Sequence, residues 1–392
     1  MPGYEVIGTE EASAVQEIFT IGGGVLFRHG FDQIRGNSYQ VRDFENEFAK
    51  YMEIPHALAV SSGTAALRVA LASLEIGQGD EVITQSFTFV ATAEAIIESG
   101  AKPIFTEIDD TLNMSPTNLK ARISSKTKAV IVVHMLGTPA RLDEILEICR
   151  EKGIPLIEDT AWGCGGEFRN SKLGTHGDIG CFSFDFAKTM TTGEGGMVVY
   201  KDEKRFLKGK AYHDHGHENN PNLPRWEDSR SSSGFNYRMT EMQGAIGRVQ
   251  LRKLDSIVSA QRKNSELLIS LIKMYKYFTI RQEPQFSNGT CDAVVFSCST
   301  LAATRIRSIL QSNGTSTKIL PEATTWHFAR HWSHLQSPDN MLETPFEKSY
   351  ETSAEILAKC ISLPNGVVLR ENFLSDLKKS LEQVIVEIEI NG

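Results

Sequence analysis

The chain has 392 residues, of which 41% are hydrophobic and 23% charged, a balance typical of a globular protein with a large core. Its formal charge of −8 argues against a basic surface for phosphate backbones, so we expect no nucleic-acid partner. The apolar runs are far shorter than the roughly 20 residues that cross a bilayer, and the N-terminus lacks the pattern of a secretory signal. We therefore expect a cytoplasmic protein with no membrane partner.

Short β-rich runs alternate with helical patterns between about residues 57 and 200, as in parallel strands joined by crossover helices. Apolar residues within 142–150 recur at i, i+3, i+4 and i+7, which predicts a helix. The predicted strands are 57–60, 81–84, 103–108, 128–134, 154–158, 179–184 and 196–200, and the predicted helices between them include 64–74 and 88–98. Together these elements predict a large α/β domain with a mainly parallel sheet.

The rest of the chain predicts a long loop followed by a smaller α+β domain. Residues 216–234 are rich in Asn, Pro, Ser and charge, which favours a loop. A helix over 240–271 then leads to a strand at 293–297 and a last helix that starts at Leu374. The expected domains are the N-terminal arm with the large domain, 1–255, and the small C-terminal domain, 256–392.

The strongest chemical signal is the segment CFSFDFAKTMTTGEGG, residues 181–196, in which a β-like run precedes Lys188 and a glycine turn. A lysine amine forms a Schiff base with an aldehyde only when it is partly deprotonated, and a sheltered position lowers its pKa. A surface lysine beside a turn is the commoner explanation for such a residue by itself. The segment resembles the cofactor-lysine segment of the DegT/StrS sugar aminotransferases. That resemblance implies an aspartate-aminotransferase-like fold and pyridoxal 5'-phosphate as the cofactor.

Two further segments resemble the same family in the expected order. Residues 61–67, SSGTAAL, follow a predicted strand and open a helix, whose first N–H groups can hold a phosphate. The resemblance places Gly63 and Thr64 at that phosphate. Asp159 ends a buried strand, and the resemblance implies that it faces the pyridinium nitrogen of the cofactor. At both places an ordinary helix cap is the alternative explanation.

The remaining cofactor contacts also follow from the resemblance. Phe89 would stack on the cofactor ring, Ser183 would bind its phosphate, and Asn236 would reach the phosphate of the neighbouring subunit. Such an exchange implies a homodimer with shared active sites. Trp162 departs from the family, which commonly has His or Gln at this position to hydrogen-bond the cofactor's phenolic oxygen. An indole can donate a hydrogen bond but cannot accept one, so Trp162 does not replace His or Gln in full.

The family implies a two-stage transfer in which Lys188 moves a proton and the cofactor alternates between pyridoxal and pyridoxamine phosphate. Glutamate is the family's usual donor, and a keto- or aldehydo-sugar is the acceptor. Lys188 argues against the dehydratase branch of the family, in which histidine replaces this lysine. By the same resemblance, we expect the residues up to about 55, including the amphipathic 41–51, to pack against the small domain.

Histidines cluster in two places, at 213–217 and at 327–334. On a helix, His327, His331 and His334 would share one face, but without an HExxH motif we expect no metal site. The aromatic segment 325–332 suits a hydroxyl-rich sugar. Together with residues 1–5 and 25–30, it looks similar to transaminases that make 8-amino-3,8-dideoxy-manno-octulosonate for lipopolysaccharide. The expected substrate contacts are Arg28, His29, His215, His327 and Arg330, with either arginine pairing with the sugar carboxylate. Surface ion pairs are the alternative for both arginines.

Three other classes of protein are alternatives for this sequence. A nicotinamide dehydrogenase would need a GxGxxG after a strand with an acidic residue about 20 positions later, and no such pattern occurs. A metal-dependent hydrolase would have to bind its metal through the histidine clusters. A non-catalytic sensor that binds the cofactor would not need both Lys188 and Asp159, so the presence of both residues argues against a sensor. We therefore expect a pyridoxal-phosphate-dependent aminotransferase acting on 8-oxo-3-deoxy-manno-octulosonate, with a nucleotide-linked 4-keto or 3-keto hexose as the alternative substrate.

Overall fold

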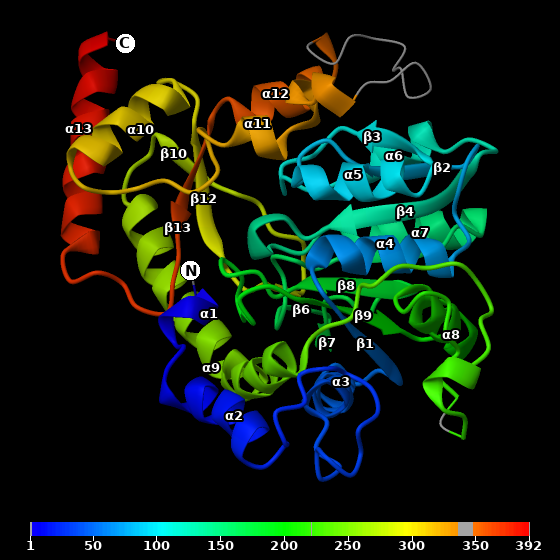
Figure 1. Ribbon diagram of the computed structural model, residues 1–392. Helices are drawn as coiled ribbons and strands as arrows, with labels where there is room; N and C mark the ends of the chain where they lie inside the picture. Colours follow the sequence, from blue (N-terminus) through cyan, green and yellow to red (C-terminus); the bar gives the residue numbers. More distant parts are fainter. Residues whose placement is uncertain (1, 221, 336–347, 392) are drawn as a thin grey trace.

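A central seven-stranded sheet organises the computed structural model, which describes residues 2–220, 222–335 and 348–391. The strand order is β1-β9-β8-β5-β4-β2-β3 (Figure 1). The strands are β1 (His56–Val60), β2 (Glu81–Gln85), β3 (Lys102–Thr106), β4 (Thr127–Val133), β5 (Leu156–Asp159), β8 (Ile179–Ser183) and β9 (Gly196–Tyr200). β9 is antiparallel to both of its neighbours, and the other pairs are parallel. The α/β class with a mainly parallel sheet is thus confirmed.

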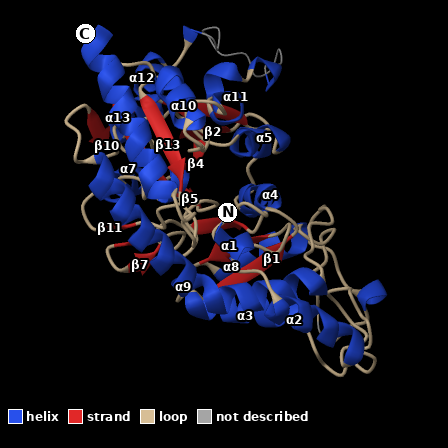
Figure 2. Ribbon diagram, turned by 90° about the vertical axis from the view of Figure 1, so that its left-hand side faces the viewer, coloured by secondary structure: helices blue, strands red, loops and turns tan. Residues whose placement is uncertain are grey.

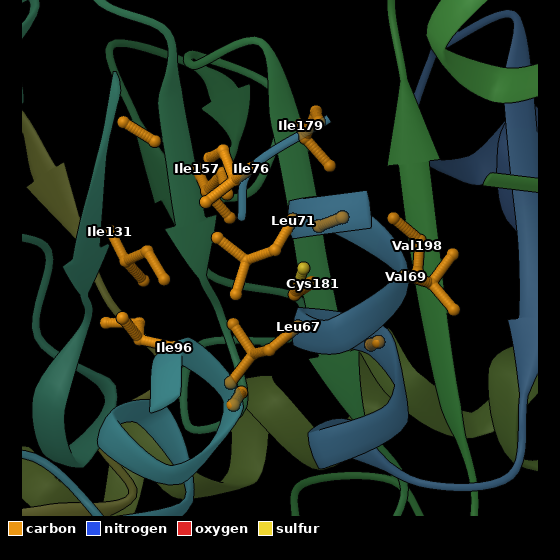
Figure 3. Close-up of a cluster of buried hydrophobic side chains, with 14 of the residues drawn as sticks. Leu67, Val69, Leu71, Ile76, Ile96, Ile131, Ile157, Ile179, Cys181 and Val198 are labelled. Atoms are coloured by element: carbon orange, nitrogen blue, oxygen red, sulfur yellow. The ribbon is translucent and has the colours of Figure 1, made fainter. Parts of the chain in front are cut away.

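Helices cover both faces of this sheet because its strands are apolar on both sides. Along β4 the alternation of side chains sends Ile131 to one face and Val130 and Val132 to the other. Figure 3 shows the first face, where Leu67 and Leu71 lie among apolar side chains of the strands. The helices on this face are α4 (Gly63–Ser73), α5 (Val90–Glu98) and α8 (Glu203–Tyr212), and those on the other face include α6 (Pro116–Arg122) and α7 (Leu142–Lys152).

The N-terminal segment packs mainly against the large domain, so its predicted packing against the small domain is wrong. Its helices are α1 (Pro2–Glu5), α2 (Thr9–Thr20) and α3 (Gln40–Tyr51). The apolar stripe of α3, Val41, Phe44 and Phe48, is buried against β1, β8, β9 and the first half of α9. The sheet presents an apolar face at β1, β8 and β9, which explains why the amphipathic helix α3 packs on it. The carboxylate of Glu5 reaches the small domain, where it accepts from the backbone N–H groups of Val367 and Val368.

A long helix, α9 (Glu241–Ile272), links the large sheet to a smaller antiparallel sheet (Figure 2). This sheet has the order β10-β12-β13, with α10 (Ala303–Ser312) and α13 (Phe373–Asn391) packed on one face. Its strands are β10 (Phe278–Ile280), β12 (Ala293–Cys298) and β13 (Cys360–Pro364). The predicted domain division at residue 255 stays a prediction, and it falls inside the continuous helix α9.

Shorter elements complete the described chain. A small sheet joins β11 (Ser287–Asn288), β6 (Glu167–Phe168) and β7 (Ser171–Lys172), and the short helices are η1 (Met135–Gly137), η2 (Arg225–Glu227), α11 (Thr324–His327), η3 (Ala329–His331), η4 (Ser333–Leu335) and α12 (Glu351–Leu357). The predicted loop at 216–234 contains η2 and otherwise no helix or strand in its described residues. Across the described ranges, no helix has both the length and the apolar character needed to cross a membrane.

Candidate active site

A cavity of about 250 Å³ opens where several parallel strands of the large sheet end. Its walls come from the segments that follow β1, β5 and β8, together with the start of α5 and one residue of α11. Ligands of open α/β sheets bind at the carboxyl ends of the strands, because loops from distant parts of the chain converge there. Of the predicted residues, the cavity is lined by Gly63, Thr64, Phe89, Asp159, Trp162, Ser183, Lys188 and His327.

Lys188 lies in the turn that follows β8. Its backbone N–H donates to the Asp185 carbonyl at 3.0 Å, and its Nζ lies 3.5 Å from the centroid of the Trp162 ring. Burial lowers the pKa of Lys188 to about 8, although the charges of Asp292, Asp185 and Asp159 oppose the shift. A substantial fraction of this amine is therefore neutral, and hence nucleophilic, near pH 8.

Asp159 is buried at the end of β5, and both of its carboxylate oxygens are engaged. Thr92 donates its hydroxyl to Oδ2 at 3.1 Å, and the Ala161 N–H donates to Oδ1 at 3.2 Å. Burial raises the pKa of Asp159, while these hydrogen bonds and the nearby Lys188 act in the opposite direction. Two fixed donors leave the carboxylate with one orientation relative to the cavity, as an ion-pairing group requires.

Sequence reasoning missed the support around Asp159. Thr88 and Thr92 share a hydrogen bond of 2.9 Å, and their i, i+4 spacing at the start of α5 was a signal in the sequence. Next to Asp159 in β5, the buried Glu158 lies 3.0 Å from His134. Burial alone would raise the pKa of Glu158, but hydrogen bonds from His134 and Gly177 lower it to about 2. This buried pair fixes the strand end that presents Asp159.

The first turn of α4 forms a second wall of the cavity. Ser62 caps the helix by accepting from the Ala65 N–H at 3.0 Å, which leaves the first backbone N–H groups of the helix, at Gly63 and Thr64, as candidate anion ligands. A Cβ at Gly63 would lie 2.7 Å from the Cβ of Ser183, so only glycine lets these two segments approach so closely. The result is a narrow cradle in which N–H and hydroxyl donors can hold a phosphate.

Aromatic rings form the third wall. The ring centroid of His327 lies 5.3 Å from that of Phe89 and 6.4 Å from that of Trp162. His327 Nδ1 donates to the Ala323 carbonyl at 2.9 Å, which leaves Nε2 as an acceptor. Burial lowers the pKa of His327 to about 4, so the imidazole is neutral at physiological pH.

The three histidines at 327–334 do not lie on one helix, so the shared face considered for them does not form. His327, His331 and His334 belong to α11, η3 and η4, which are separate short helices. The backbone of His327 and Ala329 instead pairs with Thr88 and Ser86 of the large domain, at 2.9 and 2.8 Å, so a continuous helix cannot form there. Among the residues the structure describes, no three His, Cys, Asp or Glu side chains are grouped so that they could hold a metal ion.

Five of the predicted contacts lie outside this chain's cavity lining: Arg28, His29, His215, Asn236 and Arg330. Arg28 Nη2 binds Glu45 at 2.6 and 2.8 Å, and Arg330 binds Glu351 at 2.7 Å. His29 lies 3.1 Å from Asp214, whereas His215 and Asn236 are exposed. Both arginines are thus engaged in ion pairs, a largely buried one for Arg28 and a more exposed one for Arg330, and the five roles stay predictions.

Comparison with curated proteins and solved structures places these residues in context. The chain is 38% identical over 241 residues to the GDP-perosamine synthase of Escherichia coli O157:H7, covering 60% of this chain and 65% of that one. Its identity with the Vibrio cholerae enzyme of the same name is 40% over 236 residues, 57% of this chain and 60% of that one. The match therefore spans less than two thirds of either relative.

Solved structures match over almost the full length. An aminotransferase from Psychrobacter cryohalolentis superimposes with a TM-score of 0.86 at 26% identity, covering 98% of both chains. A GDP-4-keto-6-deoxymannose-3-dehydratase, described with a trapped PLP-glutamate geminal diamine, gives 0.83 at 27%, covering 96% of this chain and 98% of that one. Residues 31–381 match the model of the DegT/DnrJ/EryC1/StrS aminotransferase family. The chain belongs to this family, as its resemblance predicted.

Proposed function

We propose that this chain is a pyridoxal-phosphate-dependent aminotransferase that transfers an amino group from glutamate to the carbonyl of a sugar. The observation that supports it most is the meeting of Lys188 and Asp159 at one cavity of about 250 Å³, although 29 residues separate them in the sequence. An amine that is partly neutral and a carboxylate with fixed orientation are the two groups that a pyridine aldehyde cofactor needs at its two ends.

The residues of the cavity fit this cofactor. The N-terminal turn of α4 and Ser183 offer donors for its phosphate, and the close approach at Gly63 forms the cradle. Phe89 and Trp162 provide aromatic faces, and Lys188 provides the covalent link. When bound, the cofactor supplies an electron-withdrawing ring that stabilises negative charge on the substrate carbon next to the transferred nitrogen.

Lys188 also has the properties of a proton carrier. The free amine of Lys188, with a pKa of about 8, would act as a base in the pH range where proton transfer is efficient. Asp159 would hold the ring nitrogen of the cofactor in its protonated form, because a nearby carboxylate favours the cation. His327, held neutral by burial, presents Nε2 as an acceptor for a substrate hydroxyl or ammonium.

The acceptor is a sugar that carries a ketone or an aldehyde. Our specific candidate is 8-oxo-3-deoxy-manno-octulosonate, whose amination would serve lipopolysaccharide synthesis, and it is suggested by the sequence resemblance at 25–30 and 325–332. The name of the GDP-perosamine synthases favours a nucleotide-linked sugar, so a nucleotide-linked 4-keto or 3-keto hexose is the second candidate. The two differ in charge, since one bears a carboxylate and the other a diphosphate.

A homodimer belongs to the same proposal. Asn236 is exposed and lies away from its own chain's cavity, so it is free to contribute to a neighbouring site. Exposed apolar side chains, Phe27, Phe31, Ile34, Trp226 and Phe235, occur on the same two segments as Arg28 and Asn236. Apolar exposure of this kind is typical of an association surface. We place the dimer in the cytoplasm.

The absorbance of the purified protein tests the activity. We expect a yellow protein whose colour is bleached by glutamate and restored by the sugar acceptor, because the amino group then leaves the cofactor again. A non-catalytic sensor would be yellow but would keep its colour with glutamate. A panel of free and nucleotide-linked keto- and aldehydo-sugars, tested on the bleached protein, identifies the acceptor. A protein that glutamate bleaches, but whose colour none of the sugars in the panel restores, would contradict the sugar assignment.

A further inference from the structure

A second cavity, of about 220 Å³, lies between the small-domain sheet and the large domain. The alternation of side chains along β12 points Val295 and Ser297 toward it, on the face opposite the one that α10 and α13 cover. Asp110 and Leu112 of the large domain line its other side. None of the residues that line it lines the active-site cavity within the described chain.

Arg281, directly after β10, lines this cavity and connects the two domains. Its Nε donates to the Thr111 carbonyl at 2.6 Å, and its Nη1 donates to the Met135 carbonyl at 2.8 Å. Its third nitrogen, Nη2, is buried and has no hydrogen-bond partner among the described residues. Burial lowers the pKa of Arg281 to about 10, which still leaves it cationic at neutral pH.

The side chains that line this cavity carry more positive than negative charge. Lys359 is a second cation in the lining, whereas the carboxylate of Asp110 is bound by Arg141 at 2.8 Å. Glu283 and Asp109 also act on the charge of Arg281, but Glu283 is exposed, Asp109 is bound by Arg141 at 3.0 Å, and neither belongs to the lining. A buried guanidinium nitrogen that donates no hydrogen bond is unfavourable, so native proteins usually supply an acceptor for such a group. The cavity therefore has the charge of a site for an anion.

We propose that this cavity binds a small organic anion, a carboxylate with an apolar chain, whose charge is balanced by Arg281 and Lys359. Leu112, Val295 and Ile356 provide apolar walls for the chain. Since the lining comes from both domains, the bound anion stabilises their mutual arrangement. The proposal does not depend on the proposed activity, because the two cavities are lined by different residues.

Calorimetric titration of the cofactor-loaded protein with hexanoate, and with neutral hexanamide, tests the site. We expect hexanoate to bind about tenfold or more tightly than hexanamide, the effect of one charge-assisted hydrogen bond. Arg281→Met should reduce hexanoate affinity to that of the amide. Hexanoate that binds this variant as tightly as it binds the unmodified protein, for instance in the active-site cavity, would overturn the proposal.

Arg262→Met is the matched control. Arg262 also donates to two backbone carbonyls, those of Gly289 at 2.9 Å and Asn288 at 2.6 Å, but it does not line the cavity. Hexanoate affinity should be unchanged in this variant. Should Arg281→Met fail to fold, Ser297→Phe decides the question, since it fills the cavity and keeps the arginine. Unchanged hexanoate binding by Ser297→Phe would place the anion elsewhere and refute the site.

Discussion

At the scale of single residues, the surroundings of Lys188 determine its chemistry. Its Nζ lies against the face of Trp162, and three carboxylates, those of Asp292, Asp185 and Asp159, act on its charge. Desolvation disfavours the ammonium form, while the carboxylates favour it, and desolvation is the larger effect. The indole of Trp162, which departs from the family's usual His or Gln, thus contacts the amine of Lys188.

The first prediction concerns the pH dependence of Lys188. The rate at which cofactor-free protein takes up pyridoxal phosphate should rise with pH to a midpoint near 8, because only the neutral amine attacks the aldehyde. An unperturbed lysine would give a midpoint of about 10.4. Stopped-flow absorbance measures the rate, and Lys188→Ala should fold normally but develop no such absorbance. Asp292→Asn should move the midpoint lower still, since Asp292 favours the charged amine; a rise would contradict this account.

At the scale of elements, the start of α4 depends on a close approach to the end of β8. Gly63 and Ser183 are 120 residues apart in the sequence, yet a single methyl group at Gly63 would crowd the serine. The conformation of the segment 213–238, between α8 and α9, depends instead on ion pairs. There the buried carboxylate of Asp214 binds Arg225 at 2.5 Å, Arg238, and His29 of the N-terminal segment at 3.1 Å.

The second prediction is that Gly63→Ala weakens cofactor binding. The added Cβ would lie 2.7 Å from the Ser183 Cβ, so the cradle must widen, at a cost of about 1–3 kcal/mol and hence about tenfold or more in affinity. Gly77→Ala is the control, because its new Cβ would meet no atom closer than 3.8 Å. Equilibrium dialysis with pyridoxal phosphate compares the two variants, and equal affinities would show that the close approach at Gly63 does not form the cradle.

The third prediction concerns Asp214. Hydrogen bonds from His29 and Arg225 outweigh burial and hold the pKa of this carboxyl far below its usual range. Its stabilising contribution is therefore complete above the unfolded-state pKa of about 3.9 and is lost as the pH falls below that value. Asp214→Asn should lower the free energy of unfolding by about 3 kcal/mol at neutral pH, because it leaves two arginines without their carboxylate.

Urea denaturation at pH 7 and at about pH 3.5 measures this effect, which should be smaller at the lower pH. Asp143→Asn is the matched control, since it removes a carboxylate whose partner Arg169 is half exposed, and it should cost less than about 1 kcal/mol. Equal destabilisation by the two substitutions would mean that the Asp214 network has no special role.

At the scale of the whole molecule, the active-site cavity depends on both domains. The small-domain segment that carries His327 is hydrogen-bonded to residues 86–88, next to Phe89 of the cavity wall. The N-terminal segment and the segment 213–238 between α8 and α9 present exposed aromatic side chains together with Asn236. In the homodimer that we propose, the second copy covers these side chains and its Asn236 completes the phosphate site.

The fourth prediction tests that arrangement with mixed dimers. Lys188→Ala and Asn236→Ala chains should each have little activity alone. When they are mixed, a hybrid dimer has one site with both defects and one with neither, so about a quarter of the normal activity should return. Activity assays after co-expression measure the recovery. No recovery, with hybrid dimers shown to form, would mean that Asn236 serves its own chain or no site at all.

The pattern of residues along the chain was enough to predict the alternating strands and helices, the family, and eight residues that line the active-site cavity, of which all but His327 belong to local motifs. Such motifs are readable because strand ends and helix starts impose their residue types over a few positions. Only the tertiary structure showed that α3 covers the large sheet, that the three histidines occupy separate helices, and that Thr92 supports Asp159. The second cavity with Arg281 also became visible only there. These features depend on contacts between segments distant in the chain, and the pattern along one segment does not specify which distant partner it meets.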